Sequence, residues 1–175
     1  MVYQGSKNKI SKYLKPIIES YLKDGMWYVE PFVGGANMID KIDWDKKCGF
    51  DNNKYLIALH KKAQETELPL LNTSREAYNI YRDKYNKAEI NNSVIYLDPP
   101  YQNTKEYQNK FNHNELLEKC KEWANNNNII LLSELTASNE YWEEIWNMEH
   151  QYTLRDKNNA NKKVVERLYI WKTKK

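Results

Sequence analysis

The chain has 175 residues, of which 41% are hydrophobic and 29% are charged, and its net charge is +3. This length suits one domain with one core, and this composition excludes collagen-like, low-complexity and wholly disordered chains. The net charge is too small to indicate a nucleic-acid partner, but residues 1–18 hold four lysines and no acid, and residues 151–175 hold eight basic groups and two acids. These basic ends permit a polyanion-binding surface without requiring one.

Several classes of protein and site are not expected. No stretch of the sequence reaches the roughly 20 apolar residues of a membrane helix, and the first residues lack the apolar core of a signal peptide. Cys48 and Cys120 lie apart in apolar surroundings, which is typical of small core residues in a reducing compartment. His60, His113 and His150 have no partner at metal-ligand spacing, so we expect surface or helix-filling roles for them and no metal site. The sequence therefore favours a cytoplasmic protein without a membrane or metal partner.

The hydrophobic pattern alternates between helical spacing and short apolar runs. In chain order it predicts a helix over 6–23, a strand over 27–32, a helix beginning at 37–42, a strand over 47–51, a helix over 53–64, a helix over 73–87 opened by a capping box, a strand over 93–98, a helix over 114–125, a strand over 129–133, a helix from Ser138 through Trp146, and a hairpin of strands over 151–156 and 164–172.

This order of elements predicts the fold class. Apolar runs of about five residues, separated by helical patterns of about a dozen, indicate a largely parallel sheet covered on both faces. We therefore expect a three-layer α/β fold with a mostly parallel sheet and an antiparallel hairpin at the C-terminal end. In such folds ligands bind at the carboxyl ends of the strands, near the point where the strand order reverses. Residues directly after strands are accordingly the candidates for function.

The first two predicted strands end in residues suited to a nucleotide-like ligand. The first ends in Glu30-Pro31-Phe32-Val33-Gly34-Gly35, where the glycines allow the backbone to approach a ligand closely. The alternative is a tight turn with Glu30 as a solvated cap. The second ends in Asp51, about 20 residues later, where a carboxylate can bind both hydroxyls of a ribose. Asp51 equally suits the N-cap of the helix that begins at Asn53.

The third strand end is the most informative. It reads Asp98-Pro99-Pro100-Tyr101, and the two prolines hold the backbone extended and remove two N–H donors. The turn therefore offers oxygen acceptors beside an aromatic ring. The amino group of a flat heterocycle can donate to the Asp98 carboxylate and the Pro99 carbonyl while its ring stacks on Tyr101. The alternative is a loop stiffened by proline with no ligand.

These motifs, in this order, resemble the Dam-type (D12 class) adenine-specific DNA methyltransferases, in which the glycine motif precedes the DPPY motif. The resemblance covers nearly the whole chain. The matching segments are Tyr3-Gln4-Gly5-Ser6-Lys7, residues 28–35, Asp51, VIYLDPPY at 94–101, the strand at 129–133 and the closing strand at 164–172. The resemblance implies a Rossmann-like methyltransferase fold, S-adenosylmethionine as the cofactor and adenine-containing DNA as the substrate.

The resemblance also implies roles for individual residues, because those matching Tyr3, Lys7, Asp51 and Asp98 contact or border the cofactor in the family. The expected cofactor site comprises Tyr3, Lys7, Glu30, Pro31, Phe32, Gly34, Asp51 and Asp98. The expected catalytic residues are Asp98, Pro99, Pro100 and Tyr101. Two departures stand out: Ala36 and Asn37 occupy positions where the family usually has further glycines, and residues 66–92 leave room only for a reduced target-recognition segment within one domain of residues 1–175.

The implied mechanism is direct transfer of a methyl group to adenine N6 after the base is flipped out of the duplex. Candidates for phosphate contact are Lys7, Lys9, Lys12, Arg75, Arg82 and Lys105. Two alternatives remain open: transfer to another amine, either cytosine N4 or a glutamine amide, and a non-catalytic module that binds nucleic acid or a partner. The resemblance further implies a restriction-modification or phage-encoded enzyme in a bacterial or phage-infected host. The recognition sequence, the oligomeric state and the need for a recognition partner stay open.

Overall fold

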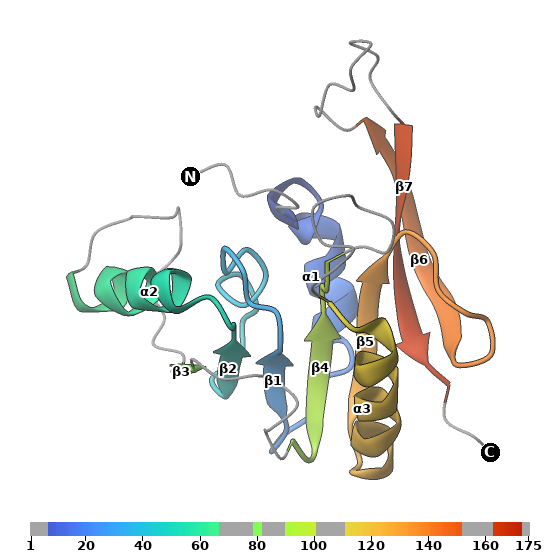
Figure 1. The fold of residues 1–175 in the computed structure, drawn as a ribbon, viewed down its shortest axis with the longest axis horizontal. Coiled ribbons are helices and arrows are strands. Elements are labelled where there is room, and N and C mark those ends of the chain that lie inside the picture. The colour runs from blue at the N-terminus through green and yellow to red at the C-terminus, as the bar shows by residue number, and fades with distance from the viewer. Residues whose placement is uncertain (1–6, 67–78, 82–89, 101–110, 152–162, 173–175) are drawn as a thin grey trace.

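The computed structural model describes residues 7–66, 79–81, 90–100, 111–151 and 163–172 (Figure 1). Its strands are β1 (Trp27–Glu30), β2 (Lys47–Phe50), β3 (Asn79–Tyr81), β4 (Ser93–Leu97), β5 (Ile129–Glu134), β6 (Trp142–Gln151) and β7 (Lys163–Trp171). Its helices are the 3₁₀ turn η1 (Lys7–Lys9), α1 (Ser11–Glu19), α2 (Lys54–Thr66) and α3 (His113–Asn125). Within these residues, the strands form one sheet in the order β3-β2-β1-β4-β5-β7-β6.

The sheet is mostly parallel and closes with an antiparallel hairpin, as the sequence predicts. Strands β1 to β5 pair in parallel, whereas β7 runs antiparallel to both β5 and β6. Val29 of β1 lies opposite Cys48 of β2 on one side and Ile95 of β4 on the other. The chain leaves β1 toward β2 and β3 in one direction and returns to β4 and β5 in the other. The strand order therefore reverses between β1 and β4, where ligands bind in folds of this type.

Two cores cover the two faces of the sheet and give the expected three layers. Successive residues of a strand point to opposite faces, and β4 is buried throughout. Its Val94 and Tyr96 pack in the same core as Leu14 of α1. Its Ile95 and Leu97 pack in the core that contains Trp123 of α3. Figure 1 shows α1 behind the sheet and α3 in front of it. The three-layer α/β prediction is confirmed.

The helix predicted from Ser138 through Trp146 is wrong, because this segment enters strand β6. Strand β6 pairs with β7 from Trp142↔Trp171 to Gln151↔Lys163, and its register shifts between Glu144 and Trp146. A bulge of this kind inserts one extra residue and interrupts the alternation of inward and outward side chains. The apolar spacing of residues 141–146 consequently resembles a helical pattern. The bulge misleads a prediction that relies on periodicity.

Other boundaries also differ from the prediction. Residues 37–42 form successive turns, not a regular helix. Residues 79–81 lie within the predicted helix over 73–87, but they form strand β3 and pair with β2. The rest of that predicted helix lies outside the described residues. In the closing hairpin the second strand is confirmed, whereas the first is β6 and the predicted strand over 151–156 lies almost wholly outside the described residues. Strands β3 and β6 form because they pair with neighbouring strands, and the local sequence pattern carries no information about that pairing.

Two expectations from composition can be compared with the described residues. Cys120 is buried in the core and Cys48 is half-buried, and both are free thiols. In the part of the chain that the structure describes, none of the helices has the length and apolar character needed to cross a membrane.

Candidate active site

The three strand ends singled out in the sequence meet at one edge of the sheet. Glu30 is the last residue of β1, Asp51 directly follows β2, and Asp98 directly follows β4. Because β1 pairs with both of the other strands, these three carboxyl groups lie on either side of the point where the strand order reverses. The fold therefore brings together the acids of the expected site. Tyr3 and Tyr101 lie outside the described residues, so their roles stay predictions.

The glycine loop after β1, residues 31–36, is held in a specific backbone conformation. Gly34 has φ +48° and Ala36 has φ +57°, both in the left-handed region that favours glycine. The backbone N–H of Gly34 donates to Asp51 Oδ2 at 3.1 Å. Ala36 adopts this backbone at a cost of about 1 kcal/mol. The alanine in place of a family glycine thus keeps the turn that the motif requires.

Asp51 is not the N-cap of α2, although the sequence permits that role. Asn53 performs it, because its Oδ1 accepts hydrogen bonds from the N–H groups of Tyr55 and Leu56 at 3.1 and 3.3 Å. The Asp51 side chain instead accepts from the N–H of Asn53 through Oδ1 at 2.8 Å and from Gly34 through Oδ2. Asp51 therefore ties the end of β2 to the glycine loop and remains partly exposed to solvent.

His60 is a further residue of the loop and was not expected there. Its side chain is buried, and its Nε2–H donates to the Gly34 carbonyl oxygen at 2.7 Å. Burial lowers the pKa of His60, while the hydrogen bond to Gly34 and the charge of Asp51 oppose this change. The expectation of a surface or helix-filling role is wrong for His60. His60 stands one helical turn after the apolar Leu56, and this spacing in the sequence could have indicated a buried position.

Glu30 is buried, so its alternative role as a solvated cap is wrong. Its Oε1 accepts a hydrogen bond from the Tyr28 hydroxyl at 2.6 Å. Burial raises the pKa of Glu30 to about 8; the charge of Asp98 adds to this rise, and the hydrogen bond from Tyr28 opposes it. At pH 7 the Glu30 carboxyl group is therefore mostly protonated and neutral.

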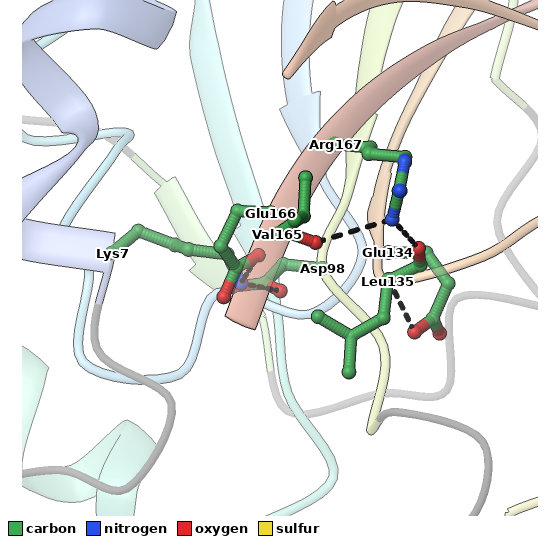
Figure 2. A network of polar contacts seen from close by, with 7 residues as sticks. All are labelled: Lys7, Asp98, Glu134, Leu135, Val165, Glu166 and Arg167. Atoms are coloured by element: carbon green, nitrogen blue, oxygen red, sulfur yellow. Dashed lines mark hydrogen bonds and ion pairs between the residues drawn. The ribbon is translucent and has the colours of Figure 1, made fainter. Parts of the chain in front are cut away.

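Lys7 and Asp98 form a buried ion pair between the N-terminal turn and the end of β4. Lys7 Nζ lies 3.0 Å from Asp98 Oδ1 and 3.4 Å from Glu166 Oε2 of β7 (Figure 2). The Lys7 side chain is 4% exposed, which excludes the phosphate contact that its charge had suggested. The Asp98 side chain is 23% exposed and can reach a ligand. Glu166 was not among the expected site residues, because no motif in the neighbouring sequence distinguishes this glutamate of the closing strand from a surface residue.

The remaining described members of the expected site are apolar. Pro31 and Pro99 are buried, and Pro100 is half-buried. Phe32 contacts Phe111 edge to face, with 5.4 Å between ring centroids. Phe111 in turn contacts His113, with 4.7 Å between ring centroids. These rings form an aromatic group at the start of α3.

The described residues fit S-adenosylmethionine, the cofactor that the fold family implies. The left-handed turn at Gly34 brings backbone close to the space beyond β1, and Asp51 presents a carboxylate beside it. A Cβ added to Gly49 would come within 2.8 Å of Val33 Cγ2, so the loop lies directly on β2 only because this residue is glycine. Gly34 and Asp51 are accordingly the residues that would hold the cofactor, with Asp98 at its edge. A cofactor contact by Glu30, which is 3% exposed, stays a prediction.

Comparison by sequence identifies one family. Residues 3–78 match the model of the D12 class N6 adenine-specific DNA methyltransferases. The match contains Lys7, the glycine loop and Asp51, and it ends before Asp98-Pro99-Pro100. No curated protein matches the chain significantly.

Comparison by structure gives similar folds at low sequence identity. A candidate RNA methyltransferase from Pyrococcus horikoshii superposes with a TM-score of 0.63 at 10% identity, over 97% of this chain and 86% of that one. A dimethyladenosine transferase from Plasmodium falciparum gives 0.56 at 15% identity, over 93% of this chain and 60% of that one. A candidate methyltransferase from Streptococcus mutans, solved in complex with SAH, gives 0.52 at 9% identity, over 91% and 96%.

The structural likenesses support the fold, and the sequence match supports the family. The family expected from the sequence is confirmed over residues 3–78, which match the D12 class of N6 adenine-specific DNA methyltransferases, and the structural likenesses confirm the Rossmann-like fold.

Proposed function

We propose that this chain transfers a methyl group from S-adenosylmethionine to the N6 amino group of adenine in DNA. The observation that supports this most directly is the position of Asp98. It follows β4 beside the reversal of strand order, its carboxylate is partly exposed, and Lys7 holds it on its buried side. DNA and adenine as substrates come from the family that residues 3–78 match.

In this proposal Asp51 and Gly34 would hold the cofactor. After it accepts from Gly34 and Asn53, Asp51 still has lone pairs that would accept from the ribose hydroxyls, and the backbone of the glycine loop would lie beside the cofactor. The cofactor supplies a methyl group on a sulfonium cation, which reacts once a nucleophile lies in line with the S–CH₃ bond. The main task of the protein is therefore positioning. Tyr3 lies outside the described residues, and its contact with the cofactor is a prediction from the family resemblance.

Asp98 and Pro99 position the acceptor amino group. The lone pair of adenine N6 is delocalised into the ring, which makes it a weak nucleophile. Hydrogen bonds from N6 to the Asp98 carboxylate and the Pro99 carbonyl draw it toward the geometry of the transition state and stabilise the charge that develops there. The target base leaves the duplex to reach them, at a cost of a few kcal/mol. In this proposal Tyr101 stacks on the flipped base.

The remaining contacts to DNA are also part of the proposal. Lys9 and Lys12 follow Lys7 closely in sequence, are exposed and can contact phosphates. Arg75, Arg82 and Lys105 lie outside the described residues. Within a single domain of residues 1–175, we assign target recognition to the short segment 66–92, of which only residues 79–81 and 90–92 are described beyond the end of α2.

A direct test incubates the purified chain with labelled S-adenosylmethionine and unmodified DNA, and analyses the nucleosides by mass. N6-methyladenine is the expected product. Asp98→Ala is expected to lower the rate at least ~100-fold, because a transition-state acceptor is lost, with cofactor affinity in calorimetry changed only a few-fold. Asp45→Ala, an exposed aspartate before β2, is the matched control and is expected to keep full activity.

Three results contradict the proposal, and each favours an alternative. Label in N4-methylcytosine, or in a glutamine amide of added protein, assigns another amine. Label in RNA but not in DNA assigns another nucleic acid. Tight cofactor binding without transfer to any acceptor indicates the non-catalytic binding module.

A further inference from the structure

Glu166 completes a buried charged group that we call the Lys7 cluster, consisting of Lys7, Asp98 and Glu166. Lys7 Nζ lies between the two carboxylates, 3.0 Å from Asp98 Oδ1 and 3.4 Å from Glu166 Oε2. Figure 2 shows the two acids on either side of the lysine head group. Glu166 is 159 residues from Lys7 in sequence, so only the tertiary fold brings them together.

The position of Glu166 on β7 places it at the same edge of the sheet as Asp98. Glu134, the last residue of β5, pairs with Arg167, so Glu166 lies one residue beyond the carboxyl end of β5. Because side chains alternate along a strand, Glu166 points to the same face as Leu168, which packs in the core with α1. Arg167 points to the other face, where its guanidinium donates to the carbonyl of Leu135 (Figure 2).

The exposed fractions of these side chains distinguish their roles. Glu166 and Lys7 are 2% and 4% exposed, whereas Asp98 is 23% exposed. Asp98 can therefore contact a ligand, and Glu166 acts on Asp98 through Lys7. A buried carboxylate without a partner is strongly unfavourable, which holds Glu166 and Lys7 together. Glu166 thus contacts the same lysine ammonium that pairs with Asp98 Oδ1, and the partly exposed Asp98 carboxylate is the group of this cluster that can accept from a ligand.

The charges around Asp98 act in opposite directions. Burial raises the pKa of Asp98, the charge and hydrogen bond of Lys7 lower it, and the charge of Glu166 raises it. Among the described residues, the other titratable groups that interact with Asp98 are Glu30 and Tyr28 of β1 and Tyr96 of β4. Loss of the Glu166 charge therefore removes one of the causes that raise the pKa of Asp98, and it makes Asp98 a weaker hydrogen-bond acceptor.

We infer that Glu166 is a positioning residue: it holds Lys7 Nζ against Asp98 Oδ1 and thereby orients the Asp98 carboxylate toward the acceptor amino group. The catalytic consequence of this inference rests on the proposed function. The effect of the Glu166 charge on the titration of Asp98 is independent of that function and can be measured separately.

The first experiment measures steady-state kinetics of Glu166→Gln against pH. We expect kcat to fall roughly tenfold with KM for the cofactor within about twofold, because the change acts on the acceptor side. We expect the acid limb of the kcat profile to move to lower pH, because the negative charge of Glu166, which raises the pKa of Asp98, is removed. Glu166→Asp keeps the negative charge but places the carboxylate farther from Lys7, because the side chain is one methylene shorter. We expect kcat to fall in this variant and the acid limb of its pH profile to stay where it is in wild type.

Glu144→Gln is the matched control on the same hairpin. Glu144 Oε2 pairs with Arg167 Nε at 3.1 Å, and its side chain is 38% exposed, away from the Lys7 cluster. We expect unchanged kcat and an unchanged acid limb for this variant. Unchanged kinetics in both Glu166 variants, or the same shift in Glu144→Gln, would overturn the inference.

The second experiment does not depend on activity. Carboxyl ¹³C NMR of aspartate-labelled protein follows the titration of Asp98, whose signal is assigned by its loss in Asp98→Asn. Titration at lower pH in Glu166→Gln than in wild type and Glu144→Gln supports the inference, and coincident titrations contradict it. If the wild type transfers no methyl group to DNA, the proposed function fails, while this titration still decides whether Glu166 acts on Asp98.

Discussion

At the scale of single residues, the site contains ionisable side chains that the fold removes from water. Glu30 is 3% exposed and accepts from the Tyr28 hydroxyl, and Lys7 is 4% exposed between two carboxylates. A charge at such a position is unfavourable unless it is paired or neutralised. Lys7 is paired, whereas Glu30 gains a proton. The two residues illustrate both outcomes within one site.

The raised pKa of Glu30 predicts a pH-dependent stability. In the folded protein it is raised to about 8 from the ordinary value of 4.5. Between these two values the folded state binds the proton more tightly than the unfolded state, so this group's contribution to stability falls as pH rises from about 5 to 8, by at most about 1.4 kcal/mol per unit. Glu30→Gln is neutral at every pH and is expected to lack this fall.

Urea unfolding of wild type and Glu30→Gln at pH 5, 6, 7 and 8 measures the effect. The free energy of unfolding of the variant, relative to wild type, is expected to increase steadily across this range. A constant difference between the two proteins would show that Glu30 keeps an ordinary pKa in the fold.

At the scale of elements, the glycine loop depends on three neighbours. Strand β1 leads into it, Asp51 at the end of β2 accepts from its Gly34 N–H, and His60 of α2 donates to its Gly34 carbonyl. Both backbone groups of one glycine are therefore held by separate elements. The loop conformation is a property of the packing of α2 and β2 and not of the loop sequence alone.

Removal of the α2 contact is expected to weaken cofactor binding. His60→Ala leaves the part-buried Gly34 carbonyl without its donor, which costs about 1 to 2 kcal/mol in loop order, or roughly a five- to thirtyfold loss of affinity. Calorimetry with S-adenosylmethionine measures this change. Lys61→Ala, an exposed neighbour on the same helix, serves as control. Equal affinities in His60→Ala and wild type would show that the His60 contact does not order the glycine loop for cofactor binding.

At the scale of the whole molecule, most of the described residues belong to the sheet, its helices and its two cores. The site lies where the strand order reverses between β1 and β4, and both faces of the sheet are covered. The net charge of +3 leaves electrostatic attraction to DNA modest. Within the described residues, little lies outside the sheet and its cores to read a DNA sequence.

We therefore expect relaxed sequence specificity. In cells that express this chain, modified-base sequencing is expected to find N6-methyladenine in many sequence contexts, since specific readout requires several base contacts worth about 1 to 3 kcal/mol each. Confinement of the modification to a single motif would contradict this expectation and point to recognition by segment 66–92 or by a partner. DNA from cells expressing Asp98→Ala is the control.

Local patterns were sufficient for much of the fold. The apolar runs of β1, β2, β4 and β5 and the helical spacing of α1, α2 and α3 are visible in the sequence, and each was expected near its observed position. β6 was mistaken for a helix because a bulge shifts its register between Glu144 and Trp146. β3 was missed because its pairing with β2 defines it. Where a neighbouring strand decides the structure, the local pattern is insufficient.

The sequence by itself determined the parallel strands β1, β2, β4 and β5, the helices α1, α2 and α3, the family match over residues 3–78 and the acids at three strand ends, because motifs and short-range periodicity express them directly. Only the tertiary structure decided which groups surround those acids. The pairing of Lys7 with Glu166, the His60 contact to Gly34 and the burial of Glu30 join segments that lie far apart along the chain or depend on packing around them. No local pattern specifies such contacts, because burial and charge pairing arise only when the sheet has formed.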